Sequence, residues 1–409
     1  MNLTRDFFNL ILDFGDEWVV QDVETDHKEC KVILHLKYCL DTYEDPLNKE
    51  EVVLFDHANE RRWRHLDILD YTCYVCCRIP RVRCFDGKVR QIRIGWADKH
   101  DRHTHQFESR VIDLLQATKN QTKAAEFLGC SPKLVNRIMH RSVSRGMERR
   151  ELSKVTMEHL SIDEKSFKEG HNYVSVLSHP KTGTVIDVSD GRDTRAVDML
   201  FETALTQEQR ESVRTISLDM WKPYMNSSED NLPNAEMVHD KFHLVAYLNK
   251  SIDLVRRREV KKNEELKYTR FIFLKTPINL TERQQEKFEL IKRANFEVTH
   301  AWECCQNFKD LFEQCSEENE AATLLFSWIG DVYKKCIKEV SKVAQMFARH
   351  ARGVINAMMT NINNAMAERL NGKIQEIKTS GRGYRTFESF RSAILFWNGG
   401  LDLYPRNWA

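Results

Sequence analysis

Apolar side chains along the chain follow two periodicities, which alternate between residues 155 and 250. Short apolar runs predict buried strands at 159–163, 172–178, 183–189, 214–219 and 235–239. Between the later runs, apolar side chains recur every three to four residues, which predicts helices near 193–205, near 222–230 and from Lys241 onward. The sequence therefore predicts three consecutive strands followed by alternating strands and helices, a mixed α/β domain.

The order of these elements, with an acidic residue on the first strand, is typical of an RNase H-like fold. Residues 245–350 are helical by pattern, so they interrupt that fold before its last helices. The gap between Asp219 and Glu368 is 149 residues (368 − 219), which is far more than a simple fold of this kind needs. We therefore expect an all-helical insertion at 245–350 and an RNase H-like domain formed by 153–244 and 351–409.

Upstream, an amphipathic start is followed by strand-like runs separated by turns, and together they predict a small β-rich domain over 1–100. Cys73 and Cys76 have the spacing of a zinc-ligand pair. They lie inside a predicted strand, however, and the sequence has no second pair of the same kind. We therefore do not expect a structural zinc, and the eleven cysteines fit a reducing cytoplasm better than a disulfide framework.

A helix-turn-helix pattern lies within 101–152. Ala125 is small enough for a close helix crossing, Gly129 permits the turn, and Ser131 followed by Pro132 starts the second helix. The second helix presents side chains of the types that reach bases and phosphates, namely Lys133, Asn136, Arg137, His140 and Arg141.

Charge separates this pattern from its alternative, a helical hairpin with a basic face. Residues 78–150 hold 17 Lys and Arg against 7 Asp and Glu, a net charge of +10, whereas residues 1–77 hold 8 against 17, a net charge of −9. Charge blocks are often only solvated surfaces, but a basic block around a helix-turn-helix pattern favours binding to DNA phosphates.

Three carboxylates at distant positions form the candidate catalytic site. Asp163 and Asp219 each end an apolar run that predicts a strand. The segment 361–378 predicts a helix in which Glu368 lies in a stripe of uncharged polar residues, opposite Met366, Leu370, Ile374 and Ile377. Alone, this helix is also typical of a surface helix with a solvated face. Three convergent carboxylates without a basic partner, however, suit a hard divalent cation.

Several motifs in order along the chain point to one family. They occupy 63–67, 80–84 with 95–97, the helix-turn-helix, 161–164, 217–220 with 223–224, 238–243 and 367–374. With these motifs the chain resembles the DDE transposases of bacterial insertion sequences, specifically the ISL3 lineage. The resemblance implies a metal-dependent DNA strand-transfer enzyme that uses Mg²⁺ or Mn²⁺.

The same resemblance implies roles for individual residues. Asp163, Asp219 and Glu368 would form the acidic triad and hold the metal, and His243 would act beside them. Two further residues would support the site, namely Asp240 and Asn371. The segment from Asp240 to His243 also has a plainer interpretation, a salt-bridged strand end.

The implied partners are the terminal inverted repeats of the element and target DNA, bound by a homodimer or higher assembly. The implied location is the bacterial cytoplasm, with nucleoid association when bound to DNA. No apolar run approaches the ~20 residues of a membrane span, so we expect no membrane partner. At the N-terminus the chain departs from the family, because only Cys39 and Cys84 align with its paired metal-ligand motifs.

Two other functions stay open from the sequence. One is a DNA-binding regulator derived from a transposase that has lost catalysis, although acids stand at all three expected positions. The other is an RNase H-like nuclease without strand transfer, which would not need a helix-turn-helix and an added N-terminal domain.

Overall fold

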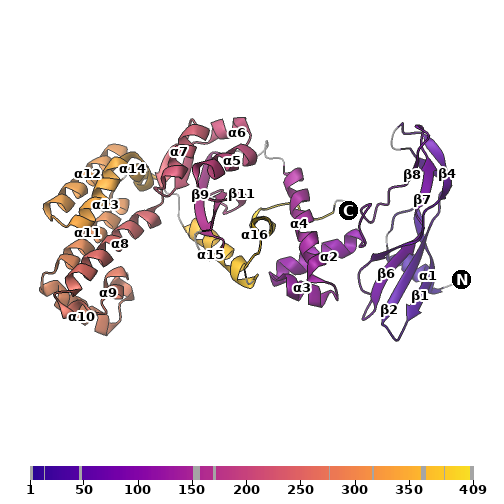
Figure 1. Cartoon of the computed structure of the whole chain (residues 1–409), viewed down its shortest axis with the longest axis horizontal. Coiled ribbons are helices and arrows are strands. Elements are labelled where there is room, and N and C mark those ends of the chain that lie inside the picture. The colour runs from indigo at the N-terminus through magenta and orange to yellow at the C-terminus, as the bar shows by residue number, and fades with distance from the viewer. Residues whose placement is uncertain are drawn as a thin grey trace. The chain divides into compact units, whose positions relative to one another are not determined.

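The computed structural model describes residues 3–12, 14–45, 48–150, 157–168, 172–275, 277–315, 317–360, 365–381 and 383–405. The chain divides into two compact units, Met1–Arg150 with Leu401–Ala409, and Glu151–Gly400. Figure 1 labels their elements. Within the described ranges, none of the helices combines the length and the apolar character needed to cross a membrane.

The N-terminal part of the first unit is rich in strands, as predicted. Helix α1 (Leu3–Ile11) precedes two four-stranded sheets. The first has the order β1-β2-β6-β5, with β1 Trp18–Asp26, β2 Lys31–Tyr38, β6 Thr72–Cys77 and β5 Arg61–Arg64. The second has the order β3-β4-β7-β8, with β3 Thr42–Glu44, β4 Glu51–His57, β7 Pro80–Arg83 and β8 Val89–Gln91. The sequence did not reveal β1, because only its first residues alternate between buried and exposed.

Tryptophans and cysteines fill the core of this β-rich part. The rings of Trp18 and Trp63 pack edge-on against Trp96 at centroid distances of 5.9 and 5.1 Å. Cys73 and Cys77 on β6 are buried in the same core, and burial raises the pKa of each thiol to about 12. A protonated, buried thiol packs as a small apolar side chain, which accounts for these cysteines without a ligand role. Folding without zinc stays a prediction.

The predicted helix-turn-helix is confirmed. Helices α2 (His105–Thr118), α3 (Gln121–Phe127) and α4 (Pro132–Arg149) follow the β-rich part. Gly129 in the turn has φ +56°, a left-handed conformation that glycine adopts without strain. The Ser131 side chain accepts a hydrogen bond from the Leu134 N–H and caps α4, whose Val135 is fully buried.

Residues 401–405 belong with this first unit, although the sequence assigned 351–409 to the catalytic domain. Arg145 on α4 donates a hydrogen bond to the Leu403 carbonyl at 2.9 Å, and the Tyr404 hydroxyl donates one to Asp113 on α2 at 2.8 Å. A Cβ atom at Gly146 would lie only 2.7 Å from the Leu401 Cβ, so glycine permits this close approach. Nothing in the sequence of this short segment indicates its partner.

The second unit is built on a five-stranded mixed sheet of order β11-β10-β9-β12-β13. Its strands are β9 His159–Ser166, β10 Tyr173–Ser178, β11 Val185–Asp190, β12 Thr215–Leu218 and β13 Glu236–His239. The first three strands are antiparallel neighbours, and β12 pairs in parallel with both β9 and β13. All five predicted strands are therefore present, near the predicted positions.

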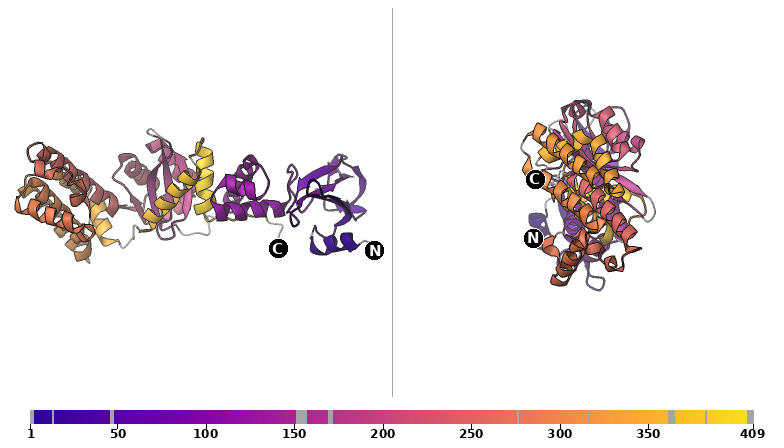
Figure 2. Two further views of the ribbon diagram at one scale, coloured as in Figure 1. Left: turned by 90° about the horizontal axis from the view of Figure 1, so that it is seen from below. Right: turned by 90° about the vertical axis from the view of Figure 1, so that its left-hand side faces the viewer.

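Helices cover both faces of this sheet. Figure 1 shows α5, α6 and α7 on one side, and α15 and α16 on the other. These helices are α5 Thr194–Ala204, α6 Gln207–Ser212, α7 Lys222–Asn231, α15 Ala365–Ser380 and α16 Phe387–Asn398. The sequence did not predict α6, a six-residue helix between α5 and β12. The left view of Figure 2 shows α15 and α16 in yellow beside the sheet.

The remaining segment of the second unit is helical, as predicted. It contains α8 Lys241–Val260, η2 Glu264–Leu266, α9 Arg270–Leu274, η3 Pro277–Asn279, α10 Glu282–Arg293, α11 Glu297–Gln314, α12 Glu318–Lys334, α13 Lys338–Arg349 and α14 Ala351–Met359. The rings of Phe308, Trp328 and Phe347 form its aromatic centre.

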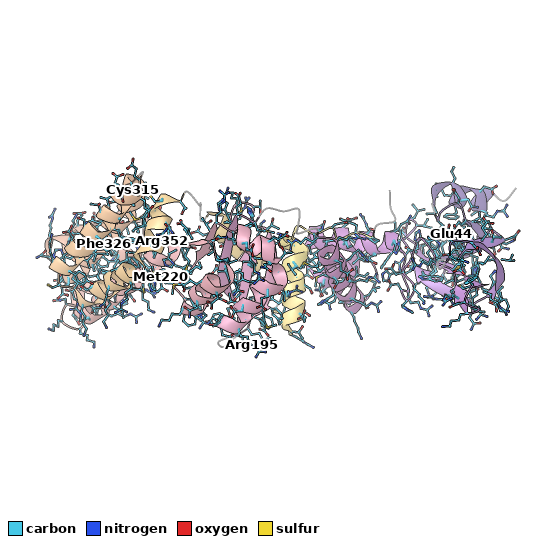
Figure 3. All side chains as sticks on the ribbon, turned by 90° about the horizontal axis from the view of Figure 1, so that it is seen from above. Glu44, Arg195, Met220, Cys315, Phe326 and Arg352 are labelled. Atoms are coloured by element: carbon cyan, nitrogen blue, oxygen red, sulfur yellow. The ribbon has the colours of Figure 1, made fainter. Side chains whose placement is uncertain are left out.

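Helix α14 connects this helical core to the sheet. Asn356 donates a hydrogen bond to the Met237 carbonyl on β13 at 2.9 Å. Arg352, labelled in Figure 3, pairs with Glu236 at 2.7 Å. The helical segment is therefore anchored to the edge strand of the sheet.

Candidate functional site

The register of two neighbouring strands places Asp163 and Asp219 together. Ser161 on β9 pairs with Ser217 on β12 in parallel. Asp163 and Asp219 each come two residues after this pair, so both lie toward the same end of two neighbouring strands, which are about 4.8 Å apart. Asp219 directly follows its strand, as predicted. Asp163 lies inside β9, which continues to Ser166, rather than at its end.

One imidazole faces both carboxylates. His243 lies on the first turn of α8, with its Nε2 atom 3.9 Å from Asp163 Oδ1 and its Nδ1 atom 3.7 Å from Asp219 Oδ2. The three side chains are between 24% and 30% exposed, so solvent and a substrate reach them. The structure thus brings together three of the four residues that the sequence singled out for catalysis.

The side chain that contacts Asp163 from α15 is Asn371. Its Nδ2 atom donates a hydrogen bond to Asp163 Oδ2 at 3.0 Å, which lays the polar stripe of α15 against the strand. On the opposite face of the helix Leu370, Ile374 and Ile377 are buried, as the periodicity predicted. The predicted supporting position of Asn371 therefore lies next to a candidate metal ligand.

Glu368 precedes Asn371 by three residues, so the two side chains share one face of α15. Glu368 is exposed. The carboxylates of Asp163, Asp219 and Glu368 do not all lie within 4.8 Å of one another in the part of the chain that is described. Glu368 therefore lies on the helix face directed to the site, but its carboxylate is not close enough to both aspartates to share one metal ion with them in this structure.

A basic side chain lies at the site, which the sequence interpretation did not include. Lys165, two residues after Asp163 and so on the same side of β9, donates to Asp163 Oδ2 at 2.7 Å. The predicted strand ended at Asp163, whereas β9 continues to Ser166, so the sequence interpretation did not place Lys165 on the same side of the strand.

Asp240 adds a further negative group. It caps α8 by accepting a hydrogen bond from the Phe242 N–H at 2.7 Å. Burial raises the pKa of the Asp240 carboxyl above its usual value, and the charges of Asp163 and Asp219 raise it further. The raised pKa therefore reflects mainly the burial of Asp240, with a smaller contribution from the two neighbouring aspartates.

Tyr247 is a residue of the site that sequence reasoning missed. It lies one helical turn after His243 on α8, and its hydroxyl donates to Asp219 Oδ1 at 3.1 Å. Burial raises the pKa of Tyr247, so its hydroxyl stays a neutral donor that orients the carboxylate. Because His243 and Tyr247 are four residues apart in a predicted helix, the sequence could have placed both side chains on the same helix face.

With the DNA cleavage that the family resemblance implies as the measured activity, we expect Tyr247→Phe to lower its rate about 10- to 100-fold, because the Asp219 carboxylate loses the donor that orients it. The protein should remain folded and bind DNA normally. Single-turnover cleavage rates test this, with Tyr268→Phe as control, since Tyr268 is 96% exposed. Equal rates for wild type and Tyr247→Phe would contradict the orienting role.

Another acidic group in the described ranges has the spacing of a metal site. Ligand atoms of Asp101, His103 and Glu108 lie within 4.8 Å of one another. Arg141 pairs with both carboxylates, and Arg145 Nη2 lies 2.6 Å from Glu108 Oε1. Because two guanidinium groups already neutralise these acids, we interpret the group as a buried ion network that joins α2 and α4.

Comparisons with known proteins show the family of the chain. A family model described as transposase, that of the ISL3 transposases, matches residues 160–394, and a model described as the helix-turn-helix domain of transposase family ISL3 matches residues 92–143. The first match covers more than half of the chain and includes every residue of the site described above. The chain belongs to the ISL3 transposase family.

Named relatives support the same conclusion. The transposase for insertion sequence element IS1557 of Mycobacterium tuberculosis is 24% identical over 357 residues, which cover 80% of this chain and 79% of that protein. The transposase for insertion sequence element IS1001 of Bordetella parapertussis is 25% identical over 343 residues, covering 81% of this chain and 82% of the relative.

The second helix of the transposase helix-turn-helix carries the predicted DNA-binding residues. Lys133 and Arg137 are exposed, one turn apart on α4, whereas Asn136 and His140 are half-buried. Arg141 is placed differently, since its guanidinium belongs to the ion network with Asp101 and Glu108. Arg141 therefore holds α4 in place in this structure, and Lys133 and Arg137 remain the most accessible candidates for contacts with DNA.

We expect the double variant Lys133→Ala with Arg137→Ala to weaken binding to the ends of the element. A base contact by Arg137 contributes about 1–3 kcal/mol, and each lost phosphate contact lowers the salt slope by about 1. Electrophoretic binding at several salt concentrations measures both quantities. Unchanged affinity and salt slope would exclude α4 as the recognition helix. Lys119→Ala with Lys123→Ala, outside α4, is the matched control for lost charge.

Proposed function

We propose that the chain binds the terminal inverted repeats of an insertion sequence and catalyses Mg²⁺-dependent DNA cleavage and strand transfer. The observation that carries this proposal is the position of Asp163 and Asp219 at the same end of two neighbouring strands. There both carboxylates face the two ring nitrogens of His243. Asn371, from the helix that bears Glu368, hydrogen-bonds Asp163 at the same place.

The sheet topology supports an RNase H-like catalytic domain. Three antiparallel strands are followed by two parallel ones in the order β11-β10-β9-β12-β13. In this arrangement the first strand lies at the centre beside the fourth, so that acids from the two strands become neighbours. The domain boundaries that we propose are 1–100, 101–152, 153–244 with 351–409, and the insertion 245–350, with residues 401–405 reassigned to the first unit.

The residues present fit a hard divalent cation. Carboxylate oxygens from Asp163 and Asp219 are accessible at the same end of the sheet, and the Asp240 carboxyl lies near enough to feel the charges of both. Glu368 would complete the ligand set by a side-chain movement on its exposed helix face. When bound, two Mg²⁺ or Mn²⁺ ions would activate the attacking oxygen and stabilise the leaving oxygen of an in-line displacement.

The other side chains of the site would position the substrate. His243 has its ring between the two aspartates, where it would orient the scissile phosphate or carry a proton. Lys165 Nζ, now on Asp163, would move to a phosphate oxygen once cations neutralise the carboxylate. Tyr247 and Asn371 would hold Asp219 and Asp163 in orientation.

Transposition joins two element ends to a target, so we propose a homodimer or higher assembly on DNA in the bacterial cytoplasm. Each active site holds one end at a time, and two ends therefore require two sites. A protein that stays monomeric on paired-end DNA and still completes both cleavages would contradict the assembly.

A cleavage assay separates this proposal from its alternatives. The substrate is a duplex carrying the end of the encoding element with its flanking DNA, tested with and without a target duplex in Mg²⁺. We expect cleavage at the element end and joined products when target is present. Binding without cleavage would identify a silent regulator, and cleavage without joining would identify a nuclease.

A further inference from the structure

Two aromatic side chains lie exposed at the rim of the site. Trp221 follows Asp219 by two residues, and Phe242 follows Asp240 by two residues. Trp221 is 40% exposed and Phe242 is 57% exposed. Single exposed aromatic side chains are common on protein surfaces, but these two follow the acids of the site along the chain and are therefore candidates for contacts with a ligand.

The indole of Trp221 is held in a fixed orientation. Its Nε1 atom donates a hydrogen bond to the Arg192 carbonyl at 3.1 Å. The Arg192 guanidinium lies 4.8 Å from the Trp221 ring centre and 4.1 Å from that of Tyr173. Arg192 also pairs at 2.6 Å with Glu164, the residue after Asp163. The indole is thus linked through Arg192 to the side of β9 opposite Asp163, and it lies next to a positive charge.

Phe242 is positioned from the other element of the site. It lies on the first turn of α8, and its ring packs edge-on against His243 at a centroid distance of 5.8 Å and an interplanar angle of 88°. Because His243 faces both Asp163 and Asp219, only the imidazole ring of His243 separates the phenyl ring from the carboxylates.

We propose that Trp221 and Phe242 are stacking surfaces for unpaired nucleobases next to the cleaved bond, so that the substrate is a locally opened DNA end. Exposed aromatic rings bind bases of any sequence by stacking, and this requires a base face that the duplex normally covers. Arg192, on the Glu164 side of β9, and Lys165, on the Asp163 side, supply positive charge for the phosphates of the opened end. This inference rests on the proposed function and specifies its substrate.

The first test compares a fully paired element end with the same duplex carrying mismatches beside the cleavage point. We expect Trp221→Ala with Phe242→Ala to lower single-turnover cleavage of the paired duplex about 10- to 100-fold, since stacking stabilises the opened end. On the mismatched duplex the variant should regain most of the wild-type rate, because the cost of opening has been removed.

Two control variants make the result specific. Phe271→Ala, at a residue that is 61% exposed on α9, should cleave both duplexes at the wild-type rate. Trp221→Phe should retain most activity because it keeps an aromatic face. Equal losses for the double variant on paired and mismatched duplexes would overturn the proposal, as would an oligomeric state altered by the double variant, which would identify the rings as an interface with a second copy.

The second test does not depend on cleavage. A 2-aminopurine placed beside the cleavage point of the paired duplex reports loss of base stacking in the helix. Without divalent metal, wild-type protein should change its fluorescence, and the double variant should bind the DNA without that change. The same fluorescence change with wild type and double variant would overturn the proposal even if the wild-type protein cleaves. A wild-type protein that does not cleave would instead contradict the proposed function.

Discussion

Replacing Asp163, Asp219 or Glu368 by the corresponding amide should abolish DNA cleavage while leaving DNA binding intact. Each substitution keeps the shape of the side chain and removes a negative charge that a divalent cation needs. The stabilisation that such cations give the transition state is several kcal/mol, so a loss of about 1000-fold or more in single-turnover rate is expected. Electrophoretic binding should be equal or slightly tighter, since repulsion between the carboxylate and DNA phosphates is relieved.

The matched control for these variants is Glu376→Gln, which removes an exposed carboxylate from the same helix as Glu368. It should cleave at the wild-type rate. The Glu368 variant is the most informative of the three. In this structure α15 contacts the site through Asn371, and the Glu368 carboxylate does not. Wild-type cleavage by Glu368→Gln would remove this residue from the triad.

Replacing Glu108 by alanine should destabilise the helix-turn-helix by about 3 kcal/mol. Glu108 is fully buried, and it pairs with Arg141 and Arg145 and lies 3.3 Å from His103. Its removal leaves two guanidinium groups without their partner, a change that typically costs 3–5 kcal/mol. We take the lower end of this range because Arg141 is 29% exposed and can be partly solvated.

Hydrogen exchange of peptides from α2 and α4 measures this opening separately from the rest of the chain. Glu148→Ala, at an exposed acidic position on α4, is the control and should leave exchange unchanged. The same measurement tests Arg141, for which sequence and structure indicate different roles. Faster exchange in Arg141→Ala would support the ion network, whereas normal exchange with weakened DNA binding would favour the role expected from the sequence.

The elements that depend on local sequence were predictable. The helix-turn-helix follows from Ser131 and Pro132, which start a helix, and from Gly129, which adopts the left-handed turn conformation. The five strands follow from apolar runs of the right length. The buried face of α15 follows from its periodicity, since Leu370 and Ile374 are buried as expected.

Contacts between distant segments were only partly predictable. Strand order brings Asp163 next to Asp219, and a sequence pattern can indicate this once a fold is assumed. The partners of a charged side chain depend on geometry that no local pattern contains. This is why Arg141 was expected to contact DNA but forms an ion pair with Glu108. It is also why the ion pair between Lys165 and Asp163 was not expected. Tyr247 belongs to the same class, because only the placement of α8 reveals its target.

The most direct test of the account is a structure of the protein bound to its element end with Mn²⁺, whose anomalous scattering locates the metal. We predict two ions about 4 Å apart, held by Asp163, Asp219 and Glu368, with the scissile phosphate beside His243. If the three carboxylates remain more than about 10 Å apart in that state, or if Mn²⁺ lies elsewhere, they cannot form the two-metal site and the proposed catalytic centre is wrong.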